Sequence, residues 1–222
     1  MINIEKVTKI FRLKQGDVIA LNDIDLQIDD NKFVLIKGHS GCGKSTLLFT
    51  LGGMLKPSSG KVQVLGMDPF KFSDRDRTKF LSSQLGFVFQ SYYLIPYLNV
   101  LQNIMLPQKA GNFVVNKRQA VEIAKQLNLE HRLLHKPSEL SIGEKQRVAL
   151  ARALVIKPKI ILADEPTGNL DPENAKEVLN HLIEFKTKGG TVIMVSHGDM
   201  ADELADSILL MNKGKISGIT KK

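Results

Sequence analysis

The feature that most constrains this chain is the stretch GHSGCGKST at residues 38–46. It fits the pattern G-x-x-x-x-G-K-[ST] of a phosphate-binding loop. The apolar run 33–36 before it is typical of a buried parallel strand, and the run 46–51 after it favours a helix. A strand, a glycine loop and a helix N-terminus in this order aim backbone N–H groups at one point, where they can hold phosphate oxygens.

Each residue type in the loop has a physical reason to be there. Glycines let the main chain curl around phosphate oxygens without a clashing Cβ. Lys44 is expected to reach the β- and γ-phosphates, and the Ser45 hydroxyl to bind Mg²⁺. The plain alternative is a glycine-rich turn with a surface lysine, which the flanking strand and helix disfavour. The phosphate-binding candidates are Gly38, His39, Ser40, Gly41, Cys42, Gly43, Lys44, Ser45 and Thr46.

The composition is that of an ordinary globular protein, with 222 residues, 43% hydrophobic and 24% charged. No apolar run reaches the ~18 residues of a membrane span, and residues 1–6 lack the apolar segment of a signal peptide, so we expect neither. Cys42, the single cysteine, fits a reducing cytosol. The net charge of +8 comes mostly from scattered lysines, which favours a solvated surface over a site for nucleic acid or anionic membrane.

Strand-like and helix-like segments alternate along the chain, which predicts an α/β fold with a parallel core. Period-two alternation at 24–28 and a short strand at 61–66 predict antiparallel β structure early in the chain. The helical pattern of 99–134 predicts a helical subdomain, about 91–157, inserted within a single domain, 1–222. The other expected elements are strands at 85–90, 160–165 and 191–195, helices at 141–156 and 171–188, and a hairpin from 207 to 217.

Polar side chains follow three of the expected core strands, at the sheet edge where α/β proteins place their chemistry. Asp164 is the natural partner of Ser45 on Mg²⁺. Glu165, one residue later, is the better candidate for the base that orients an attacking water. Gln90 could touch Mg²⁺ and that water, and His197 could donate to the γ-phosphate or hold the water with Glu165. Taken alone, Gln90 and His197 also fit structural roles.

A second helix N-terminus is predicted at Ser141. Ser141 and Glu144 stand at the spacing of a capping box. The unpaired N–H groups and the positive end of the helix dipole suit an anion, so Ser141 and Gly143 could contact a γ-phosphate. Such a second site makes sense if it serves a nucleotide held by another copy of the protein, whereas the plain reading is an ordinary capped helix.

Together these residues resemble the ATP-binding cassette (ABC) ATPase family. Residues 38–45 look like its Walker A loop, and residues 160–165 look like Walker B with its catalytic glutamate. The resemblance covers nearly the whole chain, and the order and spacing of the motifs are more specific than any single one. The remaining correspondences are Gln90 with the Q-loop, residues 140–144 with the signature motif, Asp171 with the D-loop, His197 with the switch histidine, and Phe11 with the aromatic residue that stacks on adenine.

Two stretches, 163–171 and 87–96, narrow the resemblance to the subgroup of macrolide-exporter (MacB), lipoprotein-release (LolD) and cell-division (FtsE) ATPases. One departure stands in the signature, where Ile142 replaces the usual glycine. Ser141 and Gly143, which resemble the phosphate-contacting positions, are intact. We therefore expect an active enzyme whose closure is weaker.

The resemblance implies a fold, a mechanism and partners. The fold is that of a P-loop NTPase with a RecA-like parallel core, an N-terminal antiparallel β subdomain and a helical insertion. Two copies would meet head to tail around two ATP–Mg²⁺, each between one copy's phosphate loop and the other's Ser141 segment; ATP closes the pair and hydrolysis opens it. The cassette would be cytoplasmic, peripheral on the inner face of the membrane and coupled to an integral membrane permease, with no nucleic acid expected.

Three other functions remain open from the residues. The first is a regulatory ABC ATPase of a cell-division complex. The second is a nucleic-acid ATPase, against which stand the lack of a long coiled-coil insertion and of a second cassette. The third is a P-loop kinase, against which stand the Ser141 segment and His197.

Overall fold

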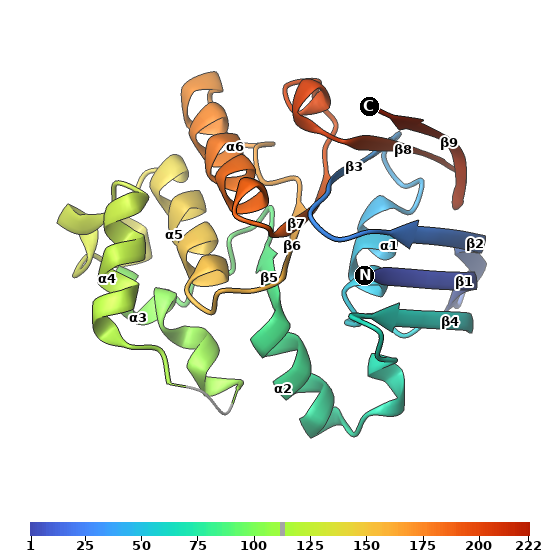
Figure 1. Ribbon diagram of the computed structural model, residues 1–222, viewed down its shortest axis with the longest axis horizontal. Helices are drawn as coiled ribbons and strands as arrows, with labels where there is room; N and C mark the ends of the chain where they lie inside the picture. The colour runs from blue at the N-terminus through green and yellow to red at the C-terminus, as the bar shows by residue number, and fades with distance from the viewer. Residues whose placement is uncertain (112–113) are drawn as a thin grey trace.

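The computed structural model describes residues 1–111 and 114–222 and contains two sheets (Figure 1). In the large sheet the strands lie in the order β5-β6-β7-β3-β8-β9, parallel except for β9, and in the small antiparallel sheet the order is β2-β1-β4. The strands are β1 (Ile2–Leu13), β2 (Gly16–Ile28), β3 (Phe33–Gly38), β4 (Ser59–Val64), β5 (Leu85–Val88), β6 (Ile160–Asp164), β7 (Thr191–Val195), β8 (Ser207–Asn212) and β9 (Lys215–Lys221).

The helices lie between these strands in sequence. The α-helices are α1 (Lys44–Leu51), α2 (Asp74–Gln84), α3 (Val100–Ile104), α4 (Lys117–Gln126), α5 (Ile142–Leu154) and α6 (Pro172–Thr187). Short 3₁₀ turns are formed by Pro69–Lys71, Leu106–Lys109, Glu130–Arg132, Pro137–Glu139 and Asp202–Leu204. The helices α3, α4 and α5 lie together at one end of the molecule, and the antiparallel sheet lies at the other (Figure 1).

The large sheet separates two apolar clusters, and its strands β5, β6, β7 and β3 are largely buried on both faces. Along β3, Phe33 and Leu35 enter one cluster, and Val34 and Ile36 enter the other. The first cluster is covered by α3, α4, α5 and α6. The second contains α1 and the inner face of the antiparallel sheet. The phosphate-loop strand is thus central in the sheet and clamped from both sides, which gives the loop that follows it a rigid base.

The structure confirms the predicted fold class, an α/β P-loop fold with an antiparallel sheet early in the chain. The predicted helices at 141–156 and 171–188 are α5 and α6. The stretch 99–134 is helical only in pieces. Helix α3 ends at Ile104, the chain continues into a 3₁₀ turn that contains Pro107, and a new helix begins after the cap at Asn116. The helix α2 was not predicted. The helical subdomain boundaries, about 91–157, stay a prediction.

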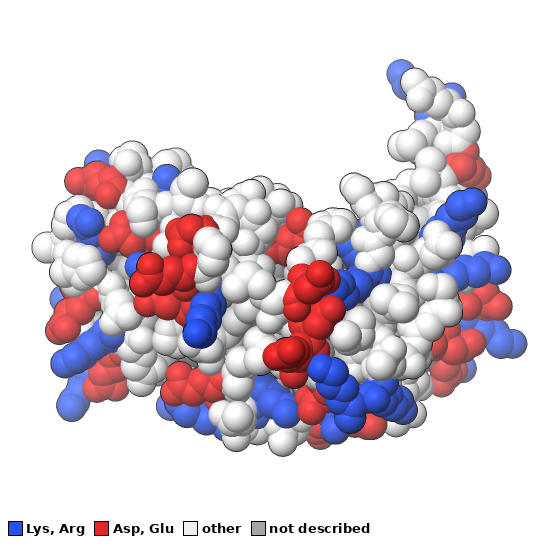
Figure 2. All heavy atoms as spheres, turned by 90° about the horizontal axis from the view of Figure 1, so that it is seen from above, with Lys and Arg blue, Asp and Glu red and all other residues white. Residues whose placement is uncertain are grey.

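No helix in residues 1–111 or 114–222 combines the length and the apolar character that crossing a bilayer requires. On the face seen in Figure 2, basic and acidic side chains are interspersed among uncharged ones. On that face the charges are mixed in sign and form no continuous basic footprint.

Candidate nucleotide-binding site

The loop between β3 and α1 keeps its shape because two of its glycines occupy places where a side chain does not fit. Gly38 has φ +152° and Gly43 has φ +105°. A Cβ on Gly38 would lie 2.3 Å from the carbonyl oxygen of Met211, and one on Gly43 would lie 2.3 Å from that of Ala20. Glycine is therefore required at both positions, and the loop packs directly on the backbones of β2 and β8.

The N-terminus of α1 is open to an anion. Gly43 is its N-cap and makes no side-chain cap bond, and the first turn carries no acidic residue. Lys44 is 5% exposed, and its Nζ donates to the carbonyl oxygens of Gly38 and His39 at 2.9 and 3.0 Å. The ammonium group thus lies inside the loop, beside N–H groups that have no side-chain partner.

The other loop residues differ in exposure. His39, Ser40 and Gly41 are exposed at the tip of the loop. Cys42 is 8% exposed and packs with the cluster of apolar side chains under the antiparallel sheet. Thr46 is half-buried, and its carbonyl oxygen accepts a bond of 2.7 Å from the hydroxyl of Thr50. The exposed tip can therefore wrap around a phosphate chain that approaches from solvent.

A hydroxyl and a carboxylate meet at the base of the loop. Ser45 Oγ donates to Asp164 Oδ1 at 2.9 Å, which joins the start of α1 to the end of β6. Burial raises the pKa of Asp164, and the nearby charge of Glu165 raises it further, against the opposing effects of the Ser45 bond and Lys44. The two side chains present hard oxygen donors side by side, which is the donor set that Mg²⁺ prefers.

Glu165 and His197 face each other at the carboxyl ends of β6 and β7. His197 Nε2 lies 2.8 Å from Glu165 Oε1. Glu165 has φ +48°, a left-handed conformation that costs a residue with a Cβ about 1–2 kcal/mol. Its N–H donates to Val195 O at 3.0 Å, which fixes the turn in this strained form. Glu165 is one of ten residues other than glycine with positive φ among those that the structure describes, so the pairing with His197, and not the strain alone, marks this position.

Gln90 and Phe11 reach the surface near the ends of their strands. Gln90 is exposed, two residues beyond β5. Phe11 on β1 is 37% exposed, with Lys9 Nζ 5.1 Å from its ring centroid. The same hairpin approaches the loop at Ala20, whose carbonyl oxygen blocks a Cβ on Gly43. The roles of Gln90 and Phe11 toward metal and adenine stay predictions.

The N-terminus of α5 is capped by its own side chains. Ser141 Oγ accepts from Glu144 N at 3.2 Å, and Glu144 Oε2 accepts from Ser141 N at 2.7 Å, which is the predicted capping box. Arg132 Nε also donates to Glu144 Oε1 at 2.7 Å. Burial alone would raise the pKa of Glu144, but these bonds outweigh it and hold that pKa below its ordinary value. Ile142 is 52% exposed in the first turn, so core packing does not account for it.

Asp171 caps α6, as predicted, and is tied to the same region through Asn174. Asp171 Oδ1 accepts from Asn174 N at 3.0 Å, and its Oδ2 accepts from Asn174 Nδ2 at 2.6 Å. Asn174 Oδ1 accepts from Arg147 on α5 at 2.7 Å and lies 2.2 Å from where a Cβ on Gly143 would be. Asn174 therefore links the start of α5 to the start of α6. Sequence reasoning did not predict this bridge, because its only local signal is an asparagine three residues after a cap.

The predicted site residues fall into two groups. The first joins the phosphate loop with Asp164, Glu165 and His197. The second joins Ser141 and its neighbours to the start of α6. Within the part of the chain that the structure describes, no hydrogen bond connects Ser141 or Gly143 to the loop.

A cavity of about 300 Å³ lies between β5 and the helical end of the molecule. Most of its lining is apolar, and Arg152 crosses it to donate to the carbonyl oxygens of Tyr92 and Tyr93. Tyr93 and Tyr97 are 65% and 75% exposed nearby in sequence. Exposed tyrosines beside an apolar cavity are typical of protein interfaces.

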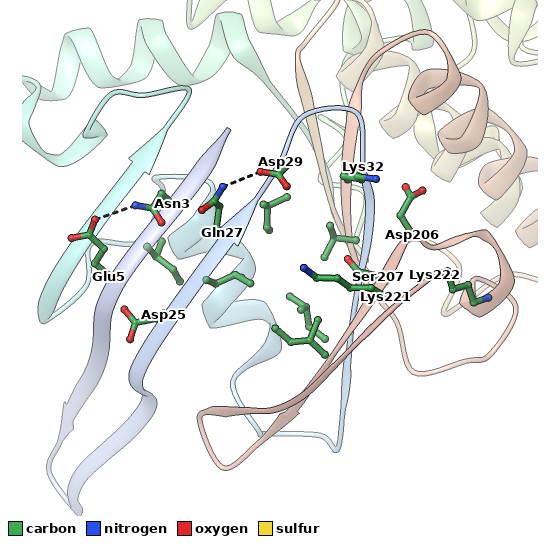
Figure 3. A pocket seen from close by; sticks show the side chains of 16 residues that line it. Asn3, Glu5, Asp25, Gln27, Asp29, Lys32, Asp206, Ser207, Lys221 and Lys222 are labelled. Atoms are coloured by element: carbon green, nitrogen blue, oxygen red, sulfur yellow. Dashed lines mark hydrogen bonds between the residues drawn. The ribbon is translucent and has the colours of Figure 1, made fainter.

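Another cavity, of about 640 Å³, lies between the antiparallel sheet and the strands β3, β8 and β9 (Figure 3). Glu5, Asp25 and Asp29 line one side, and Lys221 lines the other. It contains none of the predicted site residues, so we do not assign it to the nucleotide.

Comparison with known proteins agrees with the fold and the loop. Residues 21–168 match the family described as ABC transporter. A solved ATP-binding cassette in a dimeric post-hydrolysis state, bound to ADP and Pi, is 34% identical, with TM-score 0.93 and coverage of 100% of this chain and 98% of that chain. The chain therefore belongs to the ABC transporter family, as one of its ATP-binding ATPase cassettes.

Two curated relatives support the predicted subgroup. The lipoprotein-releasing system ATP-binding protein LolD of Legionella pneumophila (strain Paris) is 39% identical over 215 residues, which are 96% of this chain and 95% of LolD. The macrolide export ATP-binding/permease protein MacB of Chlorobaculum tepidum is 37% identical over an alignment of 226 residues, which covers 100% of this chain but 34% of MacB. The chain thus spans about a third of MacB and nearly all of LolD. These relatives favour a transporter ATPase over the cell-division alternative.

Proposed function

We propose that the protein binds ATP–Mg²⁺ in the loop of residues 38–46 and hydrolyses it as a head-to-tail homodimer that drives an integral membrane permease. One observation carries this proposal. The pairs Ser45–Asp164 and Glu165–His197 lie at the carboxyl ends of adjacent strands in the same fold as the phosphate loop. A structural loop would need neither pair.

The loop and its neighbours would hold the nucleotide and the metal. The backbone N–H groups at the start of α1, together with Lys44, face the position suited to the phosphates. Ser45 and Asp164 would hold Mg²⁺, with Gln90 reaching the same point from β5. The bound metal would neutralise charge on the phosphate oxygens. Phe11 would stack on the adenine.

Glu165 and His197 would carry the catalytic step. The Glu165 carboxylate accepts a proton from, or orients, the water that attacks the γ-phosphate. His197, whose Nε2 lies 2.8 Å from Glu165 Oε1, would fix the direction of that carboxylate or donate to the γ-phosphate. Positioning and electrostatics suffice for phosphoryl transfer, so no covalent intermediate on the protein is needed.

A second copy would complete the site. Among the described residues, no hydrogen bond joins Ser141 or Gly143 to the phosphate loop of their own chain. They lie with Asp171 in one unit, formed by the linked starts of α5 and α6. In a head-to-tail pair this unit would close over the partner copy's nucleotide. The dimeric arrangement of the solved relative bound to ADP and Pi supports this geometry.

The permease would dock at the apolar cavity beside β5. Apolar side chains from a helix or loop of a membrane subunit would enter this space of about 300 Å³, which is lined by Phe87, Phe89 and Tyr93 among others. The names of the LolD and MacB relatives support a lipoprotein-releasing or macrolide-exporting type of partner. Bound to it, the cassette would lie on the cytoplasmic face of the membrane.

The test is Glu165→Gln, which keeps the shape of the side chain and removes its charge. We expect ATP to bind normally while turnover falls by about 100-fold or more. The variant should also accumulate as an ATP-bound dimer, measured by size-exclusion chromatography. Glu130→Gln, an exposed carboxylate at the helical end of the molecule, serves as the matched control and should leave turnover unchanged.

Three results would contradict the proposal. Wild-type turnover in Glu165→Gln would remove Glu165 from catalysis. A dimer that forms equally with and without ATP would remove nucleotide from the interface. Full ATPase activity in a strict monomer, insensitive to Ser141→Ala, would remove the second copy from the site.

A further inference from the structure

A charged side chain interrupts the apolar pattern of the central strand. β3 sends Phe33 and Leu35 into the cluster beneath the helices, and alternation places Lys37 on the same face. Lys37 directly precedes Gly38, the first residue of the phosphate loop, and its side chain is only 15% exposed. A lysine so placed requires compensation from nearby carboxylates.

That compensation comes from the segment that follows His197. Lys37 Nζ donates to Asp199 Oδ1 at 2.6 Å and to both carboxylate oxygens of Asp202 at 2.8 Å. Burial lowers the pKa of Lys37, but the bonds to the two aspartates outweigh it and hold that pKa above its ordinary value. Lys37 is therefore charged throughout the neutral range, and the contact persists there.

This contact bears directly on His197. The four residues 197–200 form an exposed turn after β7, and Asp199 is two residues beyond His197. The turn is held by the pairing of His197 with Glu165, by Ser196 to Gly198 bonds of 3.2 and 3.3 Å, by a backbone bond of 3.0 Å from Asp202 N to Asp199 O, and by Lys37. Lys37 thus ties the strand that leads into the phosphate loop to the turn that carries the histidine.

We propose that Lys37 is a positioning residue that holds His197 opposite Glu165 through Asp199 and Asp202. The inference rests on the proposed role of His197 in hydrolysis. Asp199 is 90% exposed and Asp202 33% exposed, so the Asp202 half of the contact is the less screened by solvent. Because Lys37 does not line the outer tip of the loop, its loss should disturb turnover rather than ATP binding.

The test compares Lys37→Met with Lys37→Arg. Methionine suits the apolar face and keeps the length of the side chain, so the variant should fold. We expect kcat to fall by roughly 5- to 20-fold, because misplacing a catalytic group by a fraction of an ångström has effects of this order, while the KM for ATP stays within about twofold. Arginine can bridge the same two carboxylates and should restore at least about half of kcat.

A second readout does not depend on activity. In Lys37→Met, backbone hydrogen exchange should become faster in residues 197–204 and stay unchanged in α1. The matched control is Lys186→Met, which removes a half-buried ion pair of 3.2 Å with Asp206 but leaves the turn after His197 intact. It should change neither kcat nor exchange in 197–204.

The results separate this inference from the proposed function. If His197→Ala keeps wild-type turnover, the proposed role of His197 fails. If His197→Ala is inactive but Lys37→Met has wild-type kcat and wild-type exchange in residues 197–204, the positioning role of Lys37 is overturned. It is also overturned if Lys37→Met and Lys186→Met lower kcat alike, since the effect is then general destabilisation.

Discussion

Two helix N-termini in this protein are predicted to face nucleotide, and they differ in how they are capped. Helix α1 has Gly43 as its cap, with no side-chain bond to its first N–H groups. Helix α5 has Ser141 and Glu144, which satisfy each other's backbone N–H groups in a capping box. We call the start of α1 the open end and the start of α5 the closed end, although the capping box at α5 serves only the N–H groups of Ser141 and Glu144.

This difference in capping determines which N–H groups each helix end can offer to a ligand. At α1 an anion replaces water on N–H groups that no side chain serves, so the binding surface exists before the ligand arrives. At α5 the N–H groups of Ser141 and Glu144 are already taken by the capping box, so fewer backbone donors remain for a phosphate than at α1, although the Ser141 O–H can still donate to it. We therefore expect α1 to set the affinity for ATP and α5 to set the closure of the dimer.

The largest effect is expected at the open end. Lys44→Met removes the ammonium that lies inside the loop and bonds Gly38 and His39. Loss of a charged donor to phosphate should lower kcat/KM for ATP by about 100-fold or more. Steady-state hydrolysis and nucleotide binding by fluorescence would measure it. Lys61→Met, at a lysine that is 77% exposed on β4, is the control and should behave as wild type.

A smaller effect is expected at the closed end. In Gly143→Ala the new Cβ would lie 2.2 Å from Asn174 Oδ1, so Asn174 must move and its bond to Asp171 must change. We expect ATP affinity to stay within about twofold and turnover to fall by roughly 10-fold, because closure and not the cradle is disturbed. Gly218→Ala on β9, where a Cβ would meet only Leu210 at 3.7 Å, is the matched control. If Gly143→Ala lowered the affinity for ATP as much as Lys44→Met does, the distinction between the two helix ends would be wrong.

Local chemistry explains which parts could be predicted from sequence. The caps at Ser141 and Asp171 could be predicted because each depends on residues within three positions of the cap. The glycine loop between β3 and α1 is likewise a local pattern. Helix α2 escaped prediction because none of its residues is buried, so it has little apolar periodicity to detect. The bonds from Lys37 to Asp199 and from Arg147 to Asn174 join residues 162 and 27 positions apart. Only the packing of β3 and of α5 against their neighbours brings them together.

The pH dependence of stability should reveal the charge of Glu144 at the start of α5. The pKa of Glu144 is lowered in the folded protein from its ordinary value of 4.5, so the folded state favours the carboxylate. Its contribution to stability is full at neutral pH and is lost as the pH falls through the lowered pKa. Glu144→Gln should lower the free energy of unfolding by about 1 kcal/mol at pH 7, since it removes the charge that Arg132 contacts at 2.7 Å.

The deficit of the Glu144→Gln variant should shrink only once the pH drops below 4.5, the ordinary value for this carboxyl. Urea unfolding of both proteins between neutral and acidic pH would measure it. Glu139→Gln is the matched control, because Glu139 accepts from a backbone N–H of Lys136 at 2.6 Å but is exposed, and its effect should be smaller. If the difference in the free energy of unfolding did not change with pH, the hydrogen-bond geometry of the capping box, and not the charge of Glu144, would stabilise the start of α5.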